Sequence, residues 1–159
     1  MVAGLLSQAP READSSRWVL AALSDFNGQL QARDIIRFLR DATHSVGKEV
    51  YSDRILMPLD IRGAVQKSSK EKLDEVAQEV SVLDPVFEKL RNVPKHEKLL
   101  PFTRETISLN AQEESLMIQH GFLAKDGDRY YLTEIIRHAL GYSYVGGARP
   151  KVLSLLLRQ

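Results

Sequence analysis

The stretch G-F-L-A-K-D-G-D-R-Y-Y-L, from Gly121 to Leu132, has two short apolar runs on either side of a charged Asp-Gly-Asp tip. An Asp-Gly step supplies the positive φ angle that a tight hairpin turn needs, and the flanking Phe, Leu and Tyr residues are good strand formers. The sequence therefore predicts a β-hairpin at this position. The role of the hairpin depends on the elements that precede and follow it.

Helical signals lie on both sides of this hairpin. A short helix is predicted for Thr103–Ser108, and a second helix begins near Asn110 and ends at His120. After the hairpin, Thr133–Leu140 is predicted to be a helix that Gly141 ends. Helix, helix, two-stranded wing and helix is the order expected of a winged-helix domain.

The first part of the chain is predicted to be helical. A helix from Ser15 or Ser16 to Phe26 and another from Ala32 to Ser45 have apolar residues at three- and four-residue spacing. We expect the second helix to bury an apolar face, which consists of Ile35, Ile36, Leu39, Ala42 and Val46.

Two more helix starts are predicted in the middle of the chain. Residues 56–59 contain a proline and predict a turn or a short helix, whereas Ser68-Ser69-Lys70-Glu71 matches a capping box that opens a new helix. Asp84 and Pro85 then fit an N-cap and a first helical position. The apolar side expected for the capping-box helix consists of Leu73, Val76, Ala77, Val80 and Leu83.

These elements predict a mainly α fold, in which a helical bundle is followed by a winged-helix domain with a small β-hairpin. The length of 159 residues allows one good-sized core or two small ones. The expected organisation is a flexible leader at 1–16, a helical subdomain at 17–98, a winged-helix subdomain at 99–145, and a linker with a C-terminal apolar helix at 146–159.

The composition is typical of a folded globular protein, with 43% apolar and 27% charged residues. The 22 Lys and Arg residues nearly balance the 21 Asp and Glu residues, so any contact with nucleic acid must be local. The chain contains no cysteine, which excludes disulfides and thiolate chemistry. The apolar run Val2–Leu6 is too short for a signal peptide and no stretch is long enough to span a membrane, so we expect a cytoplasmic protein.

Two segments carry a family resemblance. The run SLMIQHGFLAKDGDRYYLTEIIRHALGY, residues 115–142, resembles the terminal winged-helix module of some bacterial P-loop ATPases of the STAND-like kind. The run RWVLAALSDFNGQLQARDIIRFLRDA, residues 17–42, is similar to the helical segment that follows the nucleotide-binding core in such proteins. Together the two runs cover about a third of the chain.

This resemblance implies a regulatory or protein-interaction module of a P-loop ATPase system. The chain has no Gly-x-x-x-x-Gly-Lys-Ser/Thr sequence, so it corresponds to the part of such a protein without the phosphate-binding loop, as a fragment or a separated module. The expected partner is another protein or domain, such as a P-loop ATPase core. No cofactor is expected.

The resemblance also suggests a role for arginines in the helix that begins at Ala32. Arg33 and Arg37 lie one turn apart, and either could reach a nucleotide held by another domain, as a sensor in trans would. The alternative is a solvated face, on which these arginines pair with Asp34 and Asp41.

Other sequence features do not indicate catalysis or a metal site. The run Gly146–Lys151 has glycines and two cations, but its spacing differs from that of phosphate loops, and we expect a flexible connector. No two of the four histidines are spaced for a metal, and no serine lies in a Gly-x-Ser-x-Gly elbow. We expect no catalytic residues and no metal; an enzyme of unrecognised type ranks behind the interaction and DNA-binding hypotheses.

The predicted wing can contact either protein or DNA. Its candidate interaction residues are Lys125, Arg129 and Tyr130. The helix that would enter the DNA groove, within 105–119, has three glutamates and no Lys or Arg, so it would repel phosphate. We therefore expect protein contact. The alternative is a DNA-binding winged helix that uses the wing and the basic C-terminal tail, whose cations are Arg149, Lys151 and Arg158.

The C-terminal segment Val152–Leu157 is too apolar to remain in water. It either folds back on the winged helix or packs on a second copy of the chain. The second arrangement predicts a homodimer, with an interface formed by Leu153, Leu155, Leu156 and Leu157.

Overall fold

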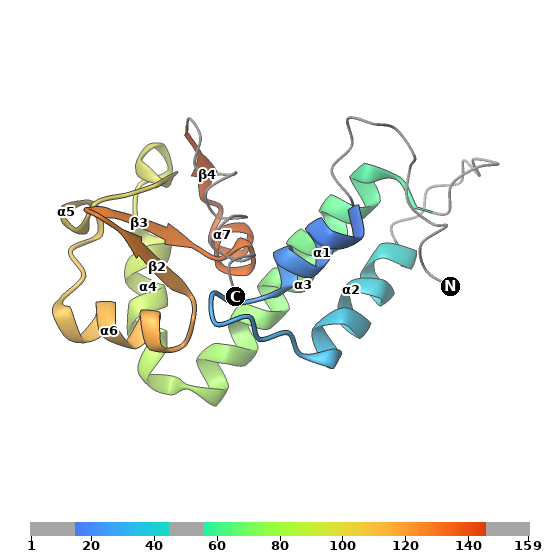
Figure 1. Ribbon diagram of the computed structural model, residues 1–159, viewed down its shortest axis with the longest axis horizontal. Coiled ribbons are helices and arrows are strands. Elements are labelled where there is room, and N and C mark those ends of the chain that lie inside the picture. The colour runs from blue at the N-terminus through green and yellow to red at the C-terminus, as the bar shows by residue number, and fades with distance from the viewer. Residues whose placement is uncertain (1–14, 45–55, 146–159) are drawn as a thin grey trace.

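The computed structural model of the protein describes residues 15–44 and 56–145 (Figure 1). Within these ranges seven α-helices accompany two small two-stranded sheets, which confirms the predicted mainly α fold. The helices are α1 (Ser15–Leu23), α2 (Ala32–His44), α3 (Pro58–Glu79), α4 (Asp84–Asn92), α5 (Arg104–Ile107), α6 (Ala111–Gln119) and α7 (Glu134–Leu140). The strands are β1 (Leu99–Leu100), β2 (Leu123–Asp126), β3 (Arg129–Leu132) and β4 (Ser143–Tyr144).

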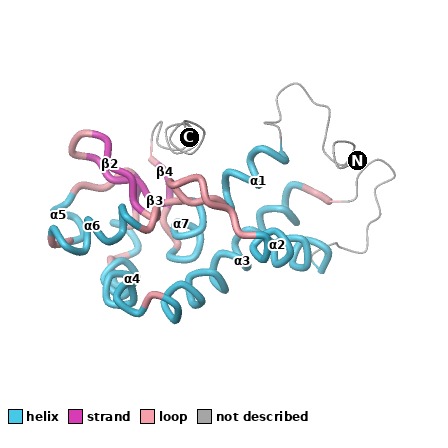
Figure 2. Tube along the Cα trace, turned by 60° about the horizontal axis from the view of Figure 1, so that its bottom comes forward, coloured by secondary structure: helices cyan, strands magenta, loops and turns pink. Residues whose placement is uncertain are grey.

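Helix α3, with 22 residues, lies between the two ends of the molecule (Figures 1 and 2). It packs against α1 and α2 and also against α7. The helix begins after Met57, whose φ of −87° and ψ of 154° are extended, as expected for a residue that precedes proline. The carboxylate of Asp60 accepts a hydrogen bond from the Met57 N–H at 3.0 Å and so caps the first turn.

The predicted helix start at Ser68 is wrong, because α3 continues through this position without a break. Ser68 and Ser69 are buried in the middle of the helix. The Ser68 hydroxyl donates to Asp41 Oδ2 at 3.1 Å, and the Ser69 hydroxyl donates to the Val65 carbonyl one turn earlier at 2.6 Å. A hydroxyl that can bond within the helix or across to α2 does not need to cap a terminus. The expected apolar side does face the core, through Leu73, Val76 and Leu83.

The buried face predicted for α2 is only partly correct. Ala42 is buried and Ile35 is partly buried against the core, as predicted. Ile36 is 67% exposed and Leu39 is 49% exposed, and Val46 lies outside the described residues. The buried residues of α2 are Asp34, Phe38, Asp41 and Ala42. The helix turns two carboxylates toward α3 because α3 supplies the cations and the hydroxyl that bind them.

Two helix ends differ from their predicted positions. Helix α1 ends at Leu23, three residues before Phe26, which lies buried in the following loop. A 3₁₀ turn, Ser81–Leu83, leads directly into α4, so Leu83 occupies the N-cap position and Asp84 is already helical.

The predicted elements of the winged helix are present. Asn110 caps α6 by accepting from the Glu113 N–H at 2.8 Å, while the Glu113 side chain accepts from the Asn110 N–H at 3.0 Å. Strands β2 and β3 form the predicted antiparallel hairpin, and a bridge from Phe102 to Tyr130 extends it on the β3 side. Strands β1 and β4 pair in parallel.

One large core joins α3, α4 and the winged-helix elements, so buried contacts cross residue 98. Phe87 packs edge-on against Phe122 with ring centroids 6.1 Å apart, and Phe102 stacks on Tyr130 at 5.8 Å. A second apolar cluster holds α1, α2 and the first half of α3 together, and consists of Ala22, Leu23, Phe38, Ala42, Ile61, Ala64 and Val65.

Candidate functional site

The loop between α1 and α2 docks on the end of α6. The Phe26 N–H donates to the Gly121 carbonyl at 2.7 Å, and the Asn27 side-chain amide donates to the Gln119 carbonyl at 3.0 Å. Gln119 is the last residue of α6, whose final carbonyls the helix itself cannot satisfy, and Gly121 lies in the turn that follows. Asp25 holds the loop in shape by accepting from the backbone N–H groups of Asn27 and Gln29.

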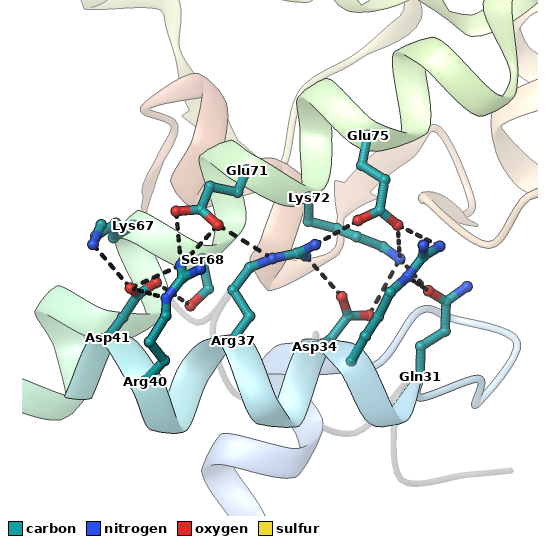
Figure 3. A network of polar contacts seen from close by, with 11 residues as sticks. Gln31, Asp34, Arg37, Arg40, Asp41, Lys67, Ser68, Glu71, Lys72 and Glu75 are labelled. Carbon is teal, nitrogen blue, oxygen red and sulfur yellow. Dashed lines mark hydrogen bonds and ion pairs between the residues drawn. The ribbon is translucent and has the colours of Figure 1, made fainter. Parts of the chain in front are cut away.

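An ion-pair network joins the polar face of α2 to α3 (Figure 3). Arg37 is at its centre and contacts Asp34, Glu71 and Glu75. Lys72 of α3 is buried beside this centre. Its ammonium donates to Gln31 Oε1 at 2.6 Å and lies 3.2 Å from Asp34 Oδ2. Each buried charge of the network therefore lies against one or more charges of opposite sign, as the low dielectric of an interior requires.

Asp41 forms a second part of the same network (Figure 3). Its carboxylate accepts from Lys67 at 2.9 Å, from Arg40 at 2.9 Å and from Ser68 at 3.1 Å. Burial would raise the pKa of Asp41, but the hydrogen bonds from Lys67, Arg40 and Ser68 hold it below its usual range. The sequence does not reveal that Asp41 joins α2 to α3, because its partners on α3, Lys67 and Ser68, lie far along the chain.

The two arginines predicted as nucleotide sensors are both engaged with carboxylates of α3. The Arg37 side chain is 14% exposed and is enclosed by its partners, whereas the Arg33 side chain is 48% exposed and contacts Glu75 and Glu79. A nucleotide from another domain would have to displace a carboxylate to reach Arg37. The sensor role of these residues remains a prediction, with Arg33 as the more accessible of the two.

The three residues predicted on the wing have different positions. Lys125 and Arg129 are exposed, as a surface role requires. Tyr130, by contrast, is 2% exposed and stacks on Phe102, so it is a core residue and cannot contact a partner from the wing surface. The Lys125 ammonium lies 3.2 Å from Glu114 of α6 and 5.2 Å from the centre of the Tyr130 ring.

A shallow surface groove of about 400 Å³ lies between α6 and β2. Its α6 wall presents Ala111, Glu114, Ser115 and Ile118, and its ends carry Arg104 and Lys125. Helix α6 itself contributes no Lys or Arg. The α6 wall of the groove therefore offers small and aliphatic contacts and no cation for a DNA backbone.

A buried carboxylate at the start of α7 was not anticipated from the sequence. Glu134 accepts from Arg137 at 2.7 Å, lies 3.3 Å from His138 Nε2 and is bonded by the Tyr144 hydroxyl. Burial would raise the pKa of Glu134, but hydrogen bonds from His138, Arg137 and Tyr144 and the charge of Arg137 lower it to about 2. The i, i+3 and i, i+4 spacing of Arg137 and His138 was the available signal.

Other site types have no support in the described residues. No group of His, Cys, Asp or Glu side chains within 15–44 and 56–145 is arranged to hold a metal ion. Among the helices that the structure describes, none combines the length and apolar character needed to cross a bilayer. The predicted dimer residues, Leu153, Leu155, Leu156 and Leu157, lie outside the described residues, as does the basic tail.

Comparison with known proteins gives no significant match to a family model, to a curated protein or to a solved structure.

Proposed function

We propose that the chain is a non-catalytic protein-interaction and regulatory module of a P-loop ATPase system in the cytoplasm. The observation that supports protein contact is the α6–β2 groove, because the exposed side of the would-be recognition helix carries Ser115 and Ile118 and no cation. The resemblance of residues 17–42 and 115–142 to ATPase modules supports the choice of partner.

A site-specific cross-link tests this proposal. A photoreactive amino acid at Ser115, in the groove, is expected to capture a protein that contains a Gly-x-x-x-x-Gly-Lys-Ser/Thr sequence in the native cell. The matched control carries the same group at Gln66, which is exposed on α3 away from the groove. Capture of such a protein from both positions, or from neither, contradicts the proposal.

Duplex DNA is the competing partner, and the wing cations Lys125 and Arg129 are the residues that would favour it. Because α6 is acidic, we expect fluorescence anisotropy to show weak DNA binding that is lost at physiological salt. Sequence-specific binding that survives this salt concentration would make the DNA-binding function the correct one.

A further inference from the structure

We propose that the α6–β2 groove binds an extended acidic peptide segment of the partner, which adds as a strand to the free edge of β2. This inference rests on the proposed function and specifies the form and charge of the segment that is recognised. Addition of a strand to a sheet edge is a general mode of peptide recognition, in which main-chain hydrogen bonds supply affinity and side-chain contacts supply specificity.

The register of the hairpin shows which backbone groups point outward. Tyr130 exchanges hydrogen bonds with Phe102, at 2.9 and 3.2 Å, so its N–H and C=O point away from β2. Lys125 is the partner of Tyr130 in the antiparallel register. The N–H and C=O of Lys125 must then point away from β3, toward the outer edge of the sheet, because the direction alternates along each strand.

This outer edge is open at Lys125. Within 15–44 and 56–145, β2 pairs with β3 alone, and no other backbone or side-chain group bonds to the main chain of Lys125. Lys125 is exposed, whereas Leu123, which has the same orientation, is buried. An added strand would therefore pair with β2 at Lys125, because the next position that faces outward, Gly127, belongs to the turn of the hairpin.

The groove beside this edge has room for the side chains of such a strand. Ala111 and Ser115 are small, and Ile118 is 39% exposed, so the α6 wall accepts an aliphatic side chain. The hairpin and α6 lie next to each other in both views of the chain (Figures 1 and 2).

The charges in the groove favour an acidic occupant. Arg104 and Lys125 carry side chains that are about half exposed, and Glu114 is the one carboxylate among the residues that line this groove. Glu114 Oε1 lies 3.2 Å from the Lys125 ammonium, but its Oε2 lies 3.9 Å from Arg104 Nε, a longer contact. The groove therefore has a net charge of one positive unit, which a carboxylate on the occupant would neutralise.

A synthetic peptide of alternating valine and aspartate tests the inference with the full chain. We expect saturable binding, measured by fluorescence anisotropy, and shifts of the NMR amide signals of Lys125 and of α6. Two N-methylated peptides, one modified at the valines and the other at the aspartates, identify strand pairing. Successive N–H groups of a strand point to opposite sides, so only one of the two should lose binding. Equal binding of both peptides, or equal loss, overturns the inference.

Charge variants on the two strands of the wing supply the matched control. Lys125→Glu is expected to weaken peptide binding about tenfold, and Lys125→Ala less, because both remove the attraction for the peptide carboxylates. Arg129→Glu makes the same charge change on β3, outside the groove, and should alter the affinity by less than about twofold. Circular dichroism confirms that each variant is folded. Equal effects of Lys125→Glu and Arg129→Glu would show diffuse attraction and overturn the inference.

The outcome is separable from that of the proposed function. Cross-linking of a P-loop protein at Ser115 without binding of the peptide overturns the strand-addition inference alone. Binding of the peptide without such a cross-link overturns the choice of partner and leaves the peptide site established.

Discussion

A Cβ atom on Gly121 would lie 2.9 Å from the side-chain amide nitrogen of Asn27. Gly121 ends the turn after α6, and Asn27 belongs to the loop between α1 and α2, so this contact joins the helical end of the molecule to the winged helix. The glycine that allows the turn also allows the loop to approach it. One position thus serves both local backbone geometry and long-range docking.

Gly121→Ala is expected to destabilise the fold by roughly 2–3 kcal/mol, because it adds a steric contact with Asn27 to the strain of a left-handed φ of +70°. Gly127→Ala is the matched control, since Gly127 has a φ of +61° but nothing within 4 Å of its Cβ position. Urea denaturation followed by the emission of Trp18 measures both. Equal losses of unfolding free energy in the two variants would mean that the contact between Gly121 and Asn27 contributes nothing to stability.

Arg37→Ala should cost on the order of 2–4 kcal/mol of unfolding free energy, because it leaves the buried carboxylate of Asp34 with fewer partners. Arg33 lies on the same helix, is about half exposed, and pairs with Glu75 and Glu79. Arg33→Ala should therefore lower the free energy of unfolding by less than about 1 kcal/mol. Thermal denaturation at low and high salt compares the two, and only the Arg33 effect should fade with salt. A larger loss of stability for Arg33→Ala than for Arg37→Ala would contradict the network in Figure 3.

Gly63→Ala is expected to stabilise the protein by about 0.5–1 kcal/mol, because Gly63 lies inside α3 with open space at its Cβ position. This prediction tests the continuous helix against the capping-box interpretation, in which Gly63 would precede the helix start at Ser68. Chemical denaturation measures the difference from the wild type. An unchanged or lower free energy of unfolding for Gly63→Ala would indicate that α3 is not helical at this position.

Acid should destabilise the fold through Glu134. Its folded pKa of about 2 is below its usual value of 4.5, so its stabilising contribution is complete above pH 4.5 and is lost as the pH falls toward 2. The full contribution is on the order of 3 kcal/mol, since one pKa unit corresponds to about 1.4 kcal/mol.

Glu134→Gln is expected to flatten the dependence of unfolding free energy on pH between 4.5 and 2. Asp128→Asn removes a carboxylate at the exposed wing tip and serves as the control. Guanidinium denaturation across this range provides the measurement. A Glu134→Gln curve with the wild-type slope would show that other carboxylates control acid unfolding.

The winged-helix elements could be predicted because their signals are local. Asn110 and Glu113 form a capping box within one turn, and the Asp-Gly step sets the hairpin. The face of α2 could be predicted only in part, because burial of Asp34 and Asp41 depends on partners that α3 supplies. Hydrophobic periodicity counts such carboxylates as surface residues.

The candidate site was predictable only in part. An exposed Lys125 follows from its position near the tip of the hairpin, but the burial of Tyr130 does not. Strand alternation places Tyr130 and Tyr131 on opposite faces, and the structure buries both, because Phe102 covers one face and Phe26 the other. Only the tertiary contacts of the hairpin reveal that it is enclosed on two sides.

The continuous course of α3 has a practical consequence for dividing the protein. The first half of this helix belongs to the apolar cluster with α1 and α2, and its second half belongs to the core of the winged helix. A protease that cleaves near Ser68 would thus remove support from both clusters at once. Limited digestion should spare α3, and gene fragments that start or stop inside it should yield aggregated rather than folded halves.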